Sequence, residues 1–118
     1  MSVDQHHQLR TRAKAFALRV IRMSQALPRT RKANVIVQQV LRSATGMAGN
    51  YRAAGRSRSK AEFIAKMGVV VEEADETVFW LEMLVDSGLI SANKLDKLQT
   101  EANELLAIFA ASRGTARG

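Results

Sequence analysis

The residues between positions 60 and 85 carry an apolar repeat that a helix places on one side. Apolar residues recur there at alternating spacings of three and four: Ile64, Met67, Val71, Ala74, Val78, Leu81 and Val85. Because an α-helix turns once every 3.6 residues, this spacing keeps them along one face. Phe63, Val70, Trp80, Met83 and Leu84 widen that face beyond a narrow stripe. We therefore expect a second copy of the chain to cover part of this helix, with Val70, Trp80, Met83 and Leu84 at the oligomer interface.

Three further segments show helical spacing, and turn signals separate them. Pro28 disfavours helical geometry at the preceding residue, and Gly55 follows the second apolar pattern. Ser59 with Glu62 forms a capping-box pattern that starts the third helix, and Gly88 ends it. The predicted helices span about residues 5–27, 30–54, 59–87 and 91–112, followed by a frayed basic tail. Short turns between long helices favour antiparallel neighbours, so the predicted fold is all-α, a single up-down-up-down four-helix bundle over residues 1–118.

Two glycines lie inside the second predicted helix, at Gly46 and Gly49. Each lowers helix stability by about 1 kcal/mol relative to alanine. The simplest compensation is a neighbouring helix packed closely against that face, so we expect a packing seam at Gly46, Gly49 and Asn50.

Charge is divided unevenly along the chain. Residues 5–61 contain no Asp or Glu but hold 13 of the 18 Lys and Arg, whereas residues 62–118 hold ten acids and five bases. The formal net charge is +7. Such an imbalance favours a nucleic acid, an acidic protein partner, or pairing between copies of the chain.

Patterns of known enzyme chemistry are missing from the sequence. It has no cysteine, no phosphate-binding loop and no nucleophile motif, so we expect no enzymatic activity, cofactor or small-molecule substrate. The acids Glu72, Glu73, Asp75 and Glu76 lack the Glu-x-x-His pairs of di-metal bundles, and we expect them to pair with the basic half instead. His6 and His7 fit a solvated terminus better than a metal site.

The location expected from the sequence is the cytoplasm. No apolar run reaches the roughly 18 residues of a membrane span. The Arg-rich start resembles a transit peptide in composition, but its residues also form an amphipathic helix that the bundle needs.

The arginines carry the remaining functional signal. Arg56, Arg58 and Lys60 lie where a helix start already favours an anion. The nucleic-acid-binding surface predicted from the sequence comprises Arg12, Arg19, Arg22, Arg52, Arg56, Arg58 and Lys60. Such a surface would contact phosphates and read little base sequence. The alternative is a solvated or self-pairing basic surface, since no aromatic platform for bases is evident.

Several short motifs resemble the signature of a known bacterial family. They are LRS at 41–43, GNYRAA at 49–54, RSRS at 56–59 leading into EFI at 62–64, EEADE at 72–76 and FWLE at 79–82. They are similar to those of the four helix bundle protein family, also called the 23S rRNA intervening sequence protein family, over roughly residues 10–112. Where many members read Asn-Ile-Ala-Glu-Gly, this chain reads NYRAAG at 50–55, which makes its loop more basic.

The resemblance implies an up-down bundle that assembles as a ring, typically a homopentamer, encoded in some bacteria within ribosomal RNA genes. The accessory proteins of diversity-generating retroelements look like the same fold and are basic, nucleic-acid-binding pentamers. Most members have no established activity. Together with the charge pattern, this leads us to expect a non-enzymatic homo-oligomer that binds RNA or DNA backbone. The alternative is a structural or adaptor oligomer that pairs with acidic protein surfaces.

Overall fold

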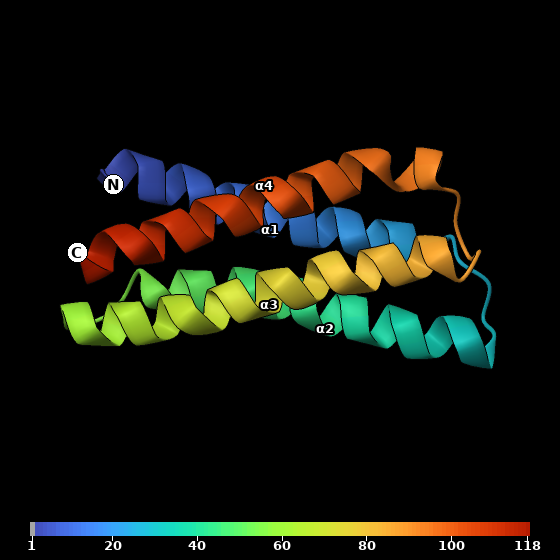
Figure 1. Cartoon of the computed structure of the whole chain (residues 1–118), viewed down its shortest axis with the longest axis horizontal. Helices are drawn as coiled ribbons and strands as arrows, with labels where there is room; N and C mark the ends of the chain where they lie inside the picture. Colours follow the sequence, from blue (N-terminus) through green and yellow to red (C-terminus); the bar gives the residue numbers. More distant parts are fainter. Residues whose placement is uncertain (1) are drawn as a thin grey trace.

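The computed structural model describes residues 2–118, which form four helices that alternate in direction along one axis (Figure 1). The helices are α1 (Val3–Gln25), α2 (Arg31–Ala54), α3 (Lys60–Asp86) and α4 (Ala92–Arg117). Both chain ends lie at the same end of a body of 44 × 22 × 20 Å. The predicted fold class, an antiparallel four-helix bundle, is therefore confirmed.

Local capping explains where the first two helices begin and end. α1 starts two residues earlier than predicted because Ser2 and Gln5 form a capping box, with the Ser2 hydroxyl accepting from the Gln5 backbone N–H at 3.1 Å. It ends at Gln25, before Pro28, whose ring disfavours helical geometry at the residue before it. Thr30 caps α2 by accepting from the Ala33 backbone N–H at 3.2 Å.

α4 continues to Arg117, so the predicted end at 112 and the frayed basic tail are wrong. Arg113 holds this last segment against α3 by donating from Nε to the Ile64 carbonyl oxygen at 3.1 Å. Its guanidinium also lies over Gly68, where an added Cβ would meet the Arg113 Nε and Nη2 atoms at 3.2 Å. The contact with a glycine surface lets the helix persist beyond its apolar pattern.

The buried stripe of α3 is offset from the predicted seam. The fully buried residues are Met67, Val70, Ala74, Thr77, Leu81 and Leu84. In the predicted seam, Val71, Val78 and Val85 are only half-buried. The offset arises because α3 packs against both α2 and α4, so its buried stripe lies between the two neighbours.

Val70 and Leu84 are corrected by this offset. Each has 0% of its surface exposed in the single chain and belongs to the central core. The prediction that these two residues contact another subunit is wrong, because no part of either side chain reaches the surface.

The two glycines inside α2 have different surroundings. An added Cβ at Gly46 would lie 2.7 Å from Oε2 of Glu73 on α3, so the expected close approach is present there. At Gly49 an added Cβ would meet nothing within 4 Å, and the residue is exposed. The predicted packing seam is thus correct at Gly46 and wrong at Gly49. Asn50 donates from its side-chain amide to the Gly46 carbonyl oxygen at 2.8 Å.

His6 lies across the end of α2 rather than in solvent. Its ring covers Gly55, where any Cβ would overlap the imidazole, and its Nδ1 is 2.7 Å from the Tyr51 hydroxyl oxygen. Gly55 has a right-handed backbone, with φ −64°, so close approach of the ring is what requires glycine here. The prediction of a solvated His6 is corrected by this contact.

None of the helices in residues 2–118 has the length and hydropathy that a membrane span requires.

The contrast between the glycines predicts different effects of alanine. Gly49→Ala is expected to stabilise the fold by about 0.5 to 1 kcal/mol, because alanine favours a helix and the space is open. Gly46→Ala is expected to gain less, because Glu73 must move. In a Glu73→Ala background, Gly46→Ala should recover the full gain. Denaturant unfolding of the single and double variants measures these differences, and equal gains at both glycines in the wild-type background would contradict the Glu73 contact.

Candidate nucleic-acid interface

The cations of α1 and α2 divide into those neutralised by α3 and α4 and those that are not. Arg12 and Arg42 are the two that form ion pairs in residues 2–118. The others of the basic half have no carboxylate within ion-pair distance in the described chain: Arg10, Lys14, Arg19, Arg22, Arg29, Arg31, Lys32, Arg52, Arg56, Arg58 and Lys60.

Arg12 joins α1 to α4 through a two-pronged contact with Glu101. Its Nε donates to Oε2 at 2.7 Å and its Nη2 to Oε1 at 2.6 Å, while Nη2 also lies 3.3 Å from Glu104. The Arg12 hydrogen bond and charge lower the pKa of Glu101, and the charge of Arg19 lowers it further. Arg12, predicted to contact nucleic acid, is therefore already occupied by carboxylates of its own chain.

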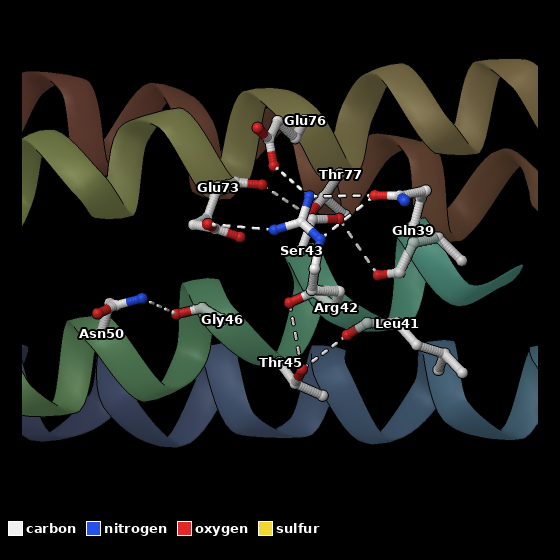
Figure 2. Close-up of polar contacts among 11 residues, drawn as sticks. Gln39, Leu41, Arg42, Ser43, Thr45, Gly46, Asn50, Glu73, Glu76 and Thr77 are labelled. Carbon is white, nitrogen blue, oxygen red and sulfur yellow. Dashed lines mark hydrogen bonds and ion pairs between the residues drawn. The ribbon is translucent and has the colours of Figure 1, made fainter. Parts of the chain in front are cut away.

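Arg42 joins α2 to α3 in the network of Figure 2. Its Nη2 donates to Glu76 at 2.8 Å and to the Gln39 side-chain oxygen at 3.2 Å, and its Nη1 is 3.6 Å from Oε1 of Glu73. The other Glu73 oxygen, Oε2, is buried against Gly46 without a hydrogen-bond partner. Burial, with the nearby charge of Glu76, raises the pKa of Glu73 despite Arg42. The expected pairing of the α3 acids with the basic half is confirmed for Glu73 and Glu76.

The start of α3 is less open to an external anion than the sequence indicates. Ser59 accepts from the Glu62 backbone N–H at 3.1 Å, as expected of a cap. The Glu62 carboxylate, however, accepts from the Arg58 backbone N–H at 3.2 Å and pairs with Lys66 at 2.9 Å. Both contacts lower the pKa of Glu62. Since an internal carboxylate already occupies this position, an external phosphate would meet a like charge there.

The side chains of Arg56, Arg58 and Lys60 nevertheless extend into solvent from the α2–α3 turn. Arg22 and Arg52 are also exposed, whereas Arg19 is half-buried. Of the seven cations predicted to bind nucleic acid, six thus remain without an ion pair in the described chain, and Arg12 does not.

A groove between α1 and α2 gathers cations that sequence reasoning did not group. Its volume is about 370 Å³, and it is lined by Arg10, Thr11, Lys14, Ala48, Gly49 and Arg52. Arg10 and Lys14 lie one helical turn apart, so their spacing of four could have indicated a shared face. The sequence could not show that this face borders Arg52, because that depends on how α1 is rotated against α2.

α3 carries an apolar surface that is partly exposed. Phe79 is 50% exposed and packs edge-on against Trp80, with ring centroids 4.9 Å apart. Trp80 and Met83 are half-buried. Sequence analysis placed Trp80 and Met83 at an interface but omitted Phe79, which is the most exposed of the three.

A second cleft, of about 1000 Å³, opens between the start of α1 and the end of α4. Leu9, Phe63 and Ile108 give it apolar walls, and His6 and Arg12 border it. The described residues contain no group of three or more His, Cys, Asp and Glu placed to hold a metal ion.

The opposite pKa shifts of Glu101 and Glu73 predict opposite effects of neutral glutamine. The lowered pKa of Glu101 means that its ionised form stabilises the fold above its usual pKa of 4.5, and that this is lost as pH falls through the folded value. The raised pKa of Glu73 means that its stabilisation is present below 4.5 and is lost as pH rises through the folded value.

At neutral pH, Glu101→Gln should therefore destabilise the protein, on the order of 1 kcal/mol, and Glu73→Gln should stabilise it. In acid, where the wild-type carboxyl groups are protonated, the stability of each variant should approach that of the wild-type protein. Thermal unfolding across pH measures this, with exposed Glu82→Gln as the control. A neutral-pH loss for Glu73→Gln as large as that for Glu101→Gln would show that attraction to Arg42 outweighs burial.

Known proteins resemble this chain over most of its length. A solved structure of a protein of unknown function from the S23 ribosomal protein family of Bacteroides thetaiotaomicron superposes with a TM-score of 0.85. It shares 27% sequence identity and covers 92% of this chain and 97% of its own. No functionally curated protein matches. Residues 5–111 match the sequence profile of the family described as 23S rRNA-intervening sequence protein. This chain belongs to the 23S rRNA-intervening sequence protein family.

Proposed function

We propose that the protein is a non-enzymatic, homo-oligomeric bundle of the cytoplasm that binds RNA or DNA backbone through the basic surface of α1, α2 and the α2–α3 turn. One observation carries the proposal: within the described chain, eleven cations of this surface have no carboxylate partner, although α3 and α4 carry ten acids. A field of unpaired arginines favours a polyanion, and the phosphate backbone is the common one.

The description of the family, 23S rRNA-intervening sequence protein, supports an association with ribosomal RNA. The resemblance to basic, nucleic-acid-binding pentamers agrees with the positive charge of this chain and implies a ring of five copies. In such a ring the unpaired cations of each copy would form a repeated binding surface, which raises avidity for a long strand.

Binding is expected to depend steeply on salt. The logarithm of the binding constant should fall linearly with the logarithm of the salt concentration, by about 0.9 per phosphate contact on duplex DNA or 0.7 on a single strand. Arg56→Gln with Arg58→Gln should weaken binding and reduce this slope. Fluorescence anisotropy with labelled RNA and DNA measures both quantities.

Lys94→Gln with Lys97→Gln is the matched control, since both lysines are exposed on α4 and the change in charge is the same. The control should bind almost as wild type does. If the wild-type protein retains no nucleic acid at low salt, the proposed function is wrong.

The exposed apolar surface of α3 favours a second candidate, an adaptor oligomer whose basic half contacts acidic protein surfaces. Phe79 and Val69 are exposed and Met83 is half-buried, so these apolar side chains are available for contact with a second copy of the chain. Acids on the same helix, Glu72 and Asp75, are exposed and without an ion pair in residues 2–118. They could pair with the arginines of a neighbouring copy.

Polar replacement of this apolar surface should dissociate the oligomer. Phe79→Ser with Met83→Ser is expected to lower the mass in solution toward the 13.0 kDa of one chain, while the helical circular dichroism signal persists. Leu18→Ser, at an exposed apolar residue of α1, is the control. Light scattering that gives the wild-type mass for the Phe79 and Met83 variant would place the interface elsewhere.

A further inference from the structure

The groove between α1 and α2 combines three features that favour an extended anionic ligand. The first is its cations: Arg10 and Lys14 stand on the α1 side and Arg52 on the α2 side, and none has a carboxylate partner in the described chain. Arg10 lies beside His7, at 2.9 Å from Nη2 to Nδ1. Three like charges around one groove repel one another, so an anion bound between them would relieve that repulsion.

The second feature is the pair of small residues, Ala48 and Gly49, that lines the groove on the α2 side. At Gly46, one turn away, Glu73 occupies the space of a side chain. At Gly49 no residue of the chain does, because an added Cβ would meet nothing within 4 Å. A glycine with this open space leaves the helix backbone accessible to a ligand that approaches it closely.

The third feature is size. One turn of a helix, about 10 to 12 Å across with its side chains and about 5.4 Å in pitch, fills more than the roughly 370 Å³ of the groove, so an acidic helix of another protein does not fit into it. A sugar-phosphate chain is thinner and can enter it. Arg10 and Lys14 lie roughly 5 to 6 Å apart at Cβ, one turn of helix, so each can contact a different phosphate.

We propose that this groove is where the protein holds a nucleic-acid strand, with Arg10 and Lys14 contacting phosphates from one side, Arg52 from the other, and Gly49 admitting the sugar-phosphate backbone. The inference rests on the proposed function and assigns it a place. No aromatic side chain lines the groove, so bases have no stacking platform and the strand is held by its backbone with little sequence preference.

The test compares two triple variants with the same loss of charge. Arg10→Gln, Lys14→Gln and Arg52→Gln remove the groove cations. Arg22→Gln, Arg29→Gln and Arg31→Gln remove three exposed cations around the α1–α2 turn, at the opposite end of these helices. Anisotropy titrations use labelled oligouridine and oligothymidine of equal length, each at several salt concentrations. The groove variant should lose about tenfold or more in affinity, and its salt slope should fall by about 2. The turn variant should lose less, because its cations belong to the basic surface and add to its field without contacting the strand in the groove.

Substitution of Gly49 tests the groove without changing charge. Gly49→Leu should weaken binding of both oligonucleotides, and Gly49→Ala should weaken it less while raising the melting temperature. A role in folding alone would not move stability and affinity in opposite directions. Similar affinities for oligouridine and oligothymidine are expected of phosphate contacts, whereas a strong preference between them would show that the site reads the 2′-hydroxyl or the thymine methyl instead.

Three results would overturn the inference, and they are distinguishable. Loss of affinity that is equal in the two triple variants would show a diffuse field, which leaves the proposed function intact but removes the groove. A changed mass in light scattering for Gly49→Leu, with unchanged binding, would show that another copy of the chain covers the groove. Absence of binding by the wild-type protein would remove the proposed function together with this site.

Discussion

The contact between α2 and α3 at Gly46 fixes the centre of the bundle. The Glu73 carboxylate stands where a side chain of Gly46 would be, and Arg42 reaches over it from α2. These two helices make the most extensive contact of the four, α1 packs on α2, α4 packs on α3, and α1 and α4 touch least. The outer helices are therefore positioned mainly through the central pair, and a change in how α2 meets α3 would move both of them.

This arrangement converts a division of charge in the sequence into a division in space. Acids reach the basic half at two places, where Glu73 and Glu76 meet Arg42 and where Glu101 and Glu104 meet Arg12. Both meetings lie on borders with α3 or α4. The border between α1 and α2 joins two helices that hold a single acid, Asp4, and in residues 2–118 this acid forms no ion pair with Arg10, Lys14 or Arg52. An unpaired basic groove follows from the order of the helices.

Sequence periodicity was sufficient for the helices and for most of the core, because helix geometry is local and apolar spacing reports it directly. It was insufficient wherever the answer depended on the rotation of one helix against another. Val70 and Leu84 lie outside the predicted seam of α3, but they are fully buried because α3 packs against both α2 and α4. Arg12 and Lys14 are two residues apart on one basic helix, but one meets Glu101 and the other lines the groove. The composition indicated that the surface charge is positive, and helix packing determines which cations remain without an ion pair.

The features that weaken the free chain coincide in the α1–α2 groove. Unpaired like charges lower the stability of a compact fold, and so does a glycine that no neighbour requires in the middle of a helix. Taken singly, the unpaired charges or the glycine would not indicate a binding site. Arg42 shows that this chain neutralises cations where helices meet, and Gly46, Gly55 and Gly68 each lie under a side chain, whereas Gly49 and Gly114 do not. Gly49 has no side chain over it, and it lies beside three cations that have no carboxylate partner in the described chain. Local losses of stability that cluster at one surface are expected where a binding site, rather than the fold, determines the residues.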